Sequence, residues 1–255
     1  MMIRRFVVAV LFLIAGLSLA QEKTESVNLV QTFFQDATIA AQPYGEGFLQ
    51  YSTYEGDLSS IDFAVQGAFP VAPKFQLGGG IGFRSLSANN NSEGGISDLA
   101  VSGRYKVLTG PTSIAVGGLA TLPIGSEDIR EGTFDFSFFG ALRHALPSGP
   151  VITGSLGVEF EEVKKLEYIR NTNQLEEGSD YENGVLIAGG LIVPMQSGLN
   201  IVTELNIRTE GDYVLLSGGL DYALQSGGRL RGALGIGLDD GAPNFVLRGG
   251  YYLGF

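Results

Sequence analysis

Apolar side chains alternate with small or polar ones along most of this chain. The alternation begins near Gly47 and continues to Phe255, interrupted by short clusters of Pro, Gly, Asn and Asp. A period of two residues is typical of β-strands that present one apolar face. The pattern predicts twelve strands, near residues 47–55, 58–69, 74–87, 97–108, 112–123, 133–146, 150–161, 181–193, 198–209, 212–225, 228–239 and 243–255.

The final segment, residues 246–255, shows the pattern most clearly. It alternates apolar with small or polar residues, carries Tyr251 and Tyr252, and stops at Phe255. Such a strand needs a hydrogen-bonding partner on both edges, and no later segment of this sequence can supply the second one. We therefore expect a barrel, in which the last strand pairs with the first and no edge remains.

The predicted connections fall into two alternating sets. One set is compact and rich in Pro and Gly: 70–73, 109–111, 147–150, 194–198 and 226–228. The other is polar and often longer: 88–96, 125–132, 162–180 and 239–244. Outer-membrane barrels have short periplasmic turns and longer outer loops, and an even strand number leaves both termini on the periplasmic side. The prediction is an all-β fold, a transmembrane antiparallel up-and-down β-barrel over residues 47–255, with ten or fourteen strands as the alternatives to twelve.

The apolar positions of each strand are expected to face lipid. They include Ile61, Phe63, Val65, Leu99, Val101, Val107, Leu199, Ile201, Leu205, Leu230, Leu234 and Ile236. Aromatic residues gather near strand ends, as expected for girdles at the two lipid–water boundaries. The alternative, a soluble sandwich with these aromatics in its core, leaves the two sets of connections unexplained.

The N-terminal region does not alternate. Residues 1–20 have a basic start, an apolar run and a small-residue exit, which predicts a secretory signal peptide cleaved before Gln21. Residues 21–46 are expected to form a periplasmic arm or a segment inserted into the lumen, and the alternatives of a disordered arm and a short amphipathic helix stay open. The chain has no cysteine and a formal net charge of −11, which excludes thiolate chemistry and disfavours nucleic acid as a partner.

Several short motifs resemble the porin-like outer-membrane proteins grouped as the phenol meta-pathway transporter family. They are found at residues 96–99 and 104–106, at 120–125, at 203–205 and in the closing run 242–255. The chain departs from the family pattern at Ile124 and at Leu253 and Gly254, where members more often have Thr and a Tyr-Arg pair. The resemblance implies a barrel that takes up small hydrophobic or aromatic compounds.

Charged residues occupy the alternate positions of the strands and are expected to line the pore. Placing an Arg or Lys near the lipid midplane costs roughly 2–4 kcal/mol, so these side chains must face the lumen. The candidate pore-lining residues are Arg84, Arg104, Lys106, Asp135, Arg143, Glu159, Glu204, Arg208, Asp221, Arg231 and Arg248. They form either a polar wall that tunes which solutes pass or an interior salt-bridge network that leaves little open bore.

No catalytic residue, metal site or cofactor is predicted. The acidic segment from Glu161 to Glu182 has no spacing typical of a calcium loop and is more simply a solvated surface loop. The single histidine, His144, is predicted to face lipid at the turn side without a serine partner in register. Residues 78–82 are glycine-rich, but they lie within a strand and no Lys-Ser or Lys-Thr pair follows them.

The sequence thus predicts a passive, porin-like channel for small solutes in the bacterial outer membrane. The alternative is a structural or adhesive barrel with a filled lumen and functional outer loops. Expected partners are outer-membrane lipid, small solutes, and the barrel-assembly machinery, which would contact the strand that ends at Phe255.

Removal of Phe255 should impair assembly, because the closing strand would lose its aromatic anchor at the membrane boundary. The yield of folded barrel can be measured by heat-modifiable gel mobility after refolding. Normal yield for the truncated chain would contradict this expectation.

Overall fold

The computed structural model describes residues 27–89, 91–129, 132–169, 174–225 and 227–255. The predicted signal peptide therefore lies outside the described residues. The strands are β1 (Tyr44–Thr53), β2 (Ser59–Ala72), β3 (Phe75–Ala88), β4 (Asn91–Ile96), β5 (Leu99–Leu108), β6 (Thr112–Leu122), β7 (Phe136–Ala145), β8 (Val151–Ile169), β9 (Gln174–Pro194), β10 (Leu199–Arg208), β11 (Tyr213–Ala223), β12 (Arg229–Gly237) and β13 (Phe245–Gly254).

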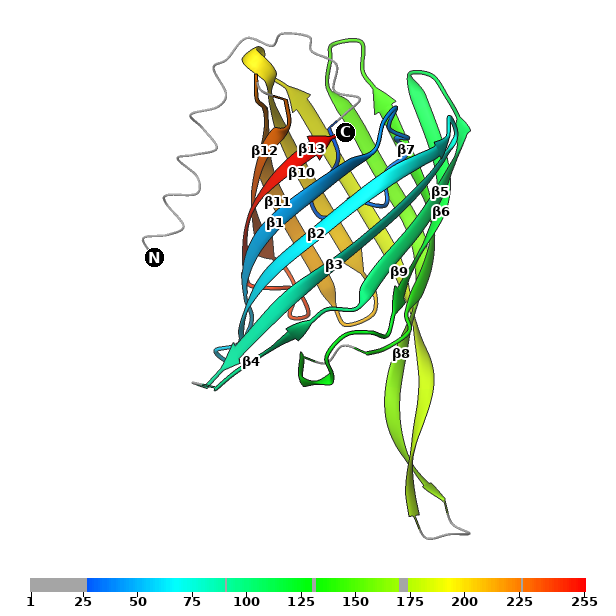
Figure 1. The fold of residues 1–255 in the computed structure, drawn as a ribbon, viewed down its shortest axis with the longest axis vertical. Helices are drawn as coiled ribbons and strands as arrows, with labels where there is room; N and C mark the ends of the chain where they lie inside the picture. Colours follow the sequence, from blue (N-terminus) through cyan, green and yellow to red (C-terminus); the bar gives the residue numbers. More distant parts are fainter. Residues whose placement is uncertain (1–26, 90, 130–131, 170–173, 226) are drawn as a thin grey trace.

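These strands form one closed antiparallel sheet (Figure 1). Strand β1 pairs with β2 on one edge and with β13 on the other, and β2 pairs with β3, so the sheet closes on itself. Strands β4 and β5 follow one another along β3 and occupy one place in the wall. The thirteen strands thus build a barrel of twelve, which confirms the predicted all-β up-and-down barrel.

The two ends of the barrel differ. At one end, here called the turn end, short connections join β2 to β3, β5 to β6, β7 to β8, β9 to β10 and β11 to β12, and the C-terminus lies there too (Figure 1). At the other end, the loop end, strands β8 and β9 continue past the barrel and form a long hairpin. The predicted division into short turns and longer loops is observed.

Three boundaries were predicted wrongly. Residues 162–180 were expected to be a loop, but β8 and β9 pair with each other as far as Ile169 and Gln174. Residues 88–96 were expected to be a loop, but 91–96 pair with β3. The barrel begins at Tyr44 rather than at Gly47. A hairpin satisfies its inner hydrogen bonds by itself, so its strands can extend beyond the rim without further neighbours.

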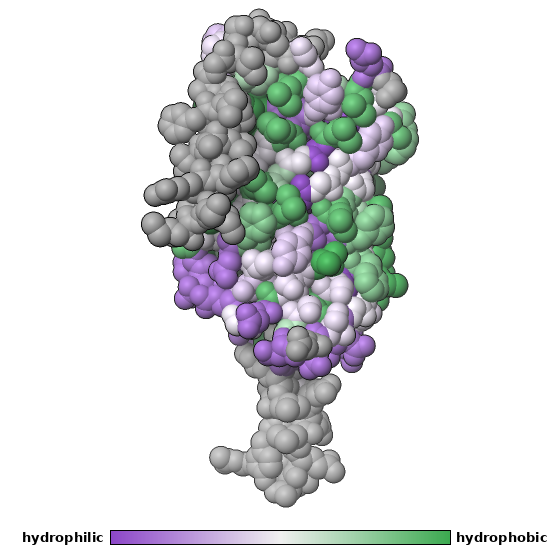
Figure 2. Space-filling view, turned by 90° about the vertical axis from the view of Figure 1, so that its left-hand side faces the viewer, coloured by the Kyte–Doolittle hydropathy of each residue, from purple (hydrophilic) through white to green (hydrophobic). Residues whose placement is uncertain are grey.

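The outer surface of the wall is apolar. Phe63 and Leu156, for example, are 58% and 61% exposed. Phe136 contacts Phe134, Phe138, Phe160 and Tyr181, which form an aromatic cluster where β7, β8 and β9 approach the loop end. Figure 2 shows hydrophobic side chains along the wall and hydrophilic ones gathered near the loop end. Among the described residues, no helix has the length and hydrophobicity needed to cross a bilayer.

Residues 27–43, here called the plug, lie inside the barrel and precede β1 without an intervening loop. Val27 and Phe33 are 0% and 2% exposed. The apolar side chains of the plug pack into three groups with wall residues, around Val202 and Ile192, around Phe139, and around Tyr44. The lumen of this barrel is therefore partly filled by the chain's own N-terminal segment.

Some wall glycines make room for neighbouring wall groups, and one pair of them gives a test. A Cβ at Gly117 would lie 2.5 Å from the Phe139 ring and 2.7 Å from the Gly103 carbonyl oxygen, whereas a Cβ at Gly140 would meet nothing within 4 Å. Gly117→Val should lower the stability of the folded barrel by about 1–3 kcal/mol, the usual cost of overpacking. Gly140→Val is the matched control and should be neutral in urea unfolding of the refolded protein. Equal midpoints for the two variants would contradict the packing described.

Candidate functional site

Ten of the eleven candidate pore-lining residues lie at lumenal positions of the strands, and Asp135 directly precedes β7 in the same phase. Seven are buried inside the barrel: Arg104, Arg143, Glu159, Glu204, Asp221, Arg231 and Arg248. Four keep part of their surface in solvent: Arg84, Lys106, Asp135 and Arg208. They face inward because their neighbours in sequence face lipid and side chains alternate along a strand.

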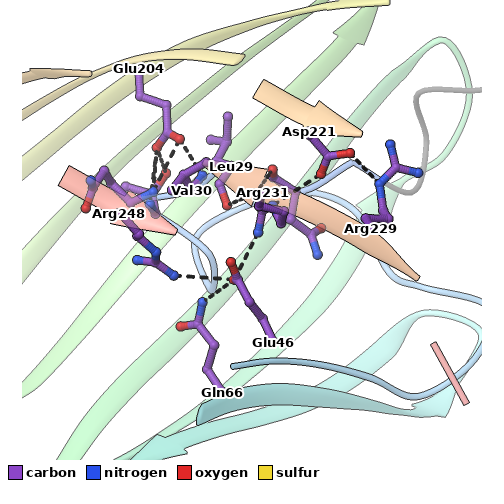
Figure 3. A network of polar contacts seen from close by, with 12 residues as sticks. Leu29, Val30, Glu46, Gln66, Glu204, Asp221, Arg229, Arg231 and Arg248 are labelled. Atoms are coloured by element: carbon purple, nitrogen blue, oxygen red, sulfur yellow. Dashed lines mark hydrogen bonds and ion pairs between the residues drawn. The ribbon is translucent and has the colours of Figure 1, made fainter. Parts of the chain in front are cut away.

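The most deeply buried charges meet at the seam where β1 pairs with β13 (Figure 3). Glu46 Oε2 accepts hydrogen bonds from Arg231 Nη1 at 2.9 Å, Arg248 Nη2 at 3.3 Å and Gln66 Nε2 at 2.8 Å. Arg231 Nε also lies 3.2 Å from Asp221 Oδ2. These five residues come from β1, β2, β11, β12 and β13, so the network spans the closing seam of the barrel.

The strand register brings these charges together. Arg231 and Asp221 are direct cross-strand partners, and Asp221 also accepts a hydrogen bond from Arg229 Nε. The side chains of Arg231 and Glu46 are 1% and 0% exposed. A buried charge that loses its partner typically costs 3–5 kcal/mol, so each member of this network depends on the others.

Arg231 of this network and Glu204 of β10 also hold the plug. The Glu204 carboxylate accepts hydrogen bonds from three successive plug amides: Val30 N, Gln31 N at 3.1 Å and Thr32 N at 3.3 Å. Arg231 Nη2 donates to two plug carbonyls, Asn28 O at 2.5 Å and Leu29 O at 3.1 Å.

Two more wall arginines bind the plug further along. Arg143 Nη1 donates to Val27 O at 3.1 Å and to Asp36 Oδ2 at 2.6 Å. Arg104 donates to Asp36 O at 3.1 Å through Nη1 and to the Tyr44 hydroxyl at 3.0 Å through Nη2. Most of these bonds reach main-chain atoms of the plug, so the wall recognises its backbone path more than its side chains.

The remaining candidates lie away from the plug contacts. Arg84 pairs with Asp62 at 2.5 Å on the neighbouring strand. Arg208 pairs with Glu159 at 2.9 Å, and also with Glu161.

Asp135 lies at the loop end and accepts a hydrogen bond from Thr121 Oγ1 at 3.1 Å and one from Glu162 N at 2.9 Å. The amide of Phe134 in turn donates to the Glu162 carboxylate at 2.9 Å, and this bond lowers the pKa of Glu162 below its usual value. Charged groups in this half of the lumen are thus paired within the wall itself.

A cavity of about 980 Å³ opens at the turn end, between the plug and the wall. We call it the vestibule. Its lining includes Asn28 and residues 38–42 of the plug, and the wall residues Lys106, Arg143, Arg229 and Tyr252. The vestibule is thus bounded by both the plug and the wall at the turn end.

The sequence did not identify three residues that complete the site. Glu46 lay outside the predicted barrel, Gln76 carries no charge, and Asp36 lies in the region without alternation. Glu46 accepts from two arginines, Gln76 accepts from Ala40 N at 3.0 Å, and Asp36 pairs with Arg143. One signal could have revealed Glu46. It lies an even number of residues before the lumenal positions of the predicted strand 47–55, so it continues the same alternation.

His144 is hydrogen-bonded across the wall. Its Nδ1 lies 2.7 Å from the hydroxyl of Thr112, its direct partner on β6. Among the described residues, no group of three or more His, Cys, Asp or Glu side chains is arranged to hold a metal ion.

Comparison with known proteins gives a family and several similar folds. Residues 42–255 match the family model described as the MetA-pathway of phenol degradation. An outer membrane channel from Pseudomonas putida F1 is similar with a TM-score of 0.62 at 14% identity, covering 89% of this chain and 100% of that one. The NanC porin has a TM-score of 0.55 at 8% identity, covering 84% and 100%. The CymD monoaromatic hydrocarbon channel has a TM-score of 0.50 at 10% identity, covering 86% and 90%. No curated protein matches the chain.

Glu204→Gln should loosen the plug, because a neutral amide replaces the charged acceptor of three plug N–H groups. Hydrogen bonds to charged groups contribute about 1.5–3 kcal/mol each, so amide exchange at residues 30–32 should accelerate tenfold or more. Hydrogen–deuterium exchange of the refolded barrel measures this. Asp62→Asn, which alters a wall carboxylate paired with Arg84, is the control and should leave exchange of these amides unchanged. Equal protection in the Glu204→Gln variant would show that Glu204 does not hold the plug.

Proposed function

The chain belongs to the family described as the MetA-pathway of phenol degradation. On this premise, we propose that it is a passive outer-membrane channel for small solutes, including hydrophobic and aromatic compounds. The observation that carries the proposal is a closed barrel with an apolar outer surface and charged residues confined to its lumen. A barrel of this kind satisfies every condition for spanning a bilayer with strands.

The proposed orientation follows from the two ends. Outer-membrane barrels place short turns in the periplasm and longer loops outside. The turn end, with the vestibule, is accordingly the periplasmic end, and the β8–β9 hairpin projects from the cell. We further propose that the assembly machinery recognises β13, whose terminal Phe255 is 71% exposed at the turn end.

The proposed solute class is inferred from the family description, from a similar channel and from the size of the lumen. The family is described by phenol degradation, and one similar fold is a channel for monoaromatic hydrocarbons. Twelve strands enclose a lumen between that of filled eight-stranded barrels and that of open sixteen-stranded porins. With the plug in place, the remaining space suits small solutes rather than large ones.

A structural or adhesive barrel is the second candidate. The plug, with its many hydrogen bonds to the wall, favours it, as does the long hairpin that extends beyond the loop end. The two candidates differ in ionic conductance. A channel conducts ions with its native plug in place or after small movements of the plug, whereas a structural barrel does not conduct ions.

Conductance of the full mature chain in planar bilayers separates the two. A channel should give stable ohmic steps, and Glu204→Gln should raise the step size because its plug is held less firmly. Asp62→Asn is again the matched control and should conduct like the parent chain. A barrel that is folded by heat-modifiable mobility but silent in every variant would support the structural candidate.

A further inference from the structure

Charges at the loop end are mostly negative. Among the described residues, the carboxylates of the connections and strand ends there include Glu55, Asp57, Glu93, Asp98, Glu127, Asp128, Asp135, Glu161, Glu162, Asp180, Glu182, Glu210, Asp212, Asp239 and Asp240. The basic residues among them include Lys164, which lies 3.7 Å from Glu127, Lys165, and Arg208, which pairs with Glu159 and Glu161. The hydrophilic surface near this end is visible in Figure 2.

Charges at the turn end have the opposite sign. Lys74, Lys106 and Arg229 lie at or next to the turns, and the described residues of these turns include no Asp or Glu. The vestibule repeats the pattern, since Lys106, Arg143 and Arg229 line it and no carboxylate residue does. Asp36 and Asp221, which pair with Arg143 and Arg229, are each only 1% exposed and lie behind those arginines.

This separation is notable in a chain whose formal net charge is −11. Fixed charges around a narrow passage bounded by low-dielectric walls focus the potential along it. Screening acts over about 10 Å at 0.1 M salt and about 3 Å at 1 M salt, so charges around a narrow mouth reach its axis at the lower concentration. The two mouths therefore have opposite potentials.

We propose that the lumen is a charge-polarised pore, with an acidic outer mouth and a basic periplasmic vestibule, that rectifies ionic current and favours uncharged solutes over ions of either sign. The proposal rests on the channel function proposed above. An anion is repelled at the outer mouth, and a cation that has entered is repelled at the vestibule. An uncharged solute meets neither barrier, so the arrangement selects for neutrality in addition to size.

The polarity also fixes the direction of rectification. When the outer side is positive, cations are driven in through the acidic mouth and anions through the basic vestibule, and both accumulate in the lumen. When the outer side is negative, each ion must enter through the mouth that repels it. Current should therefore be larger with the outer side positive.

The test is the current–voltage relation of the full mature chain in a planar bilayer. Orientation can be read from a biotin attached at Ser179→Cys in the exposed hairpin, with streptavidin added to one side, because the chain has no cysteine of its own. At 0.1 M KCl the current ratio between opposite voltages should be roughly two- to five-fold, and it should approach one at 1 M KCl.

Charge variants assign the effect to the two mouths. Lys74→Gln with Lys106→Gln, and separately Asp239→Asn with Asp240→Asn, should each lower the ratio. Lys164→Gln removes the same type of charge from the loop end, beside Glu127, and should not lower the ratio. Liposome swelling should be faster with erythritol than with erythronate, its carboxylate analogue.

The outcomes separate the two proposals. A folded barrel that never conducts overturns the channel function. A barrel that conducts with symmetric current at 0.1 M KCl, or that admits erythronate as fast as erythritol, overturns the charge-polarised pore and leaves the channel function standing.

Discussion

The structure depends on the requirement that backbone N–H and C=O groups in hydrocarbon be paired within the protein. Lipid offers no hydrogen bonds, so an open sheet edge in the membrane would leave a row of unpaired groups. Pairing of β1 with β13 removes that edge. Once the sheet is closed, alternation along each strand fixes one face toward lipid and the other toward the lumen, and the charged side chains of the wall take the lumenal positions.

Charges forced into the lumen must then find partners there. Many wall residues pair with one another across neighbouring strands, as Arg84 does with Asp62. Others bind the main chain of the plug, with Glu204 accepting from amides and Arg231 and Arg104 donating to carbonyls. The same desolvation cost that keeps charges out of lipid therefore stabilises an N-terminal segment inside the barrel.

These two constraints leave an asymmetric lumen. The plug fills part of it, and the vestibule lies beside the plug at the turn end. Paired charges in the middle of the lumen contribute little net potential, whereas the unequal distribution at the two mouths contributes a large one. Size is thus controlled by the plug and the wall, and charge by the mouths, which is consistent with a passage for small uncharged compounds.

The sequence by itself predicted the barrel, a count of about twelve strands and the two types of connection. Alternation of side chains also predicted the inward direction of residues such as Arg143 and Glu204, because a period of two is a local property of the chain. The plug could not be assigned in this way. Residues 27–43 have no periodicity, and their path is set by Glu204, Arg231, Arg143 and Arg104, which lie far from them in sequence. The choice between an open polar wall and a paired network was likewise decided only in three dimensions. This choice depends on which strands become neighbours at the seam, because their pairing brings Glu46 beside Arg231 and Arg248. Residues so far apart in sequence leave no local pattern that would predict their hydrogen bonds.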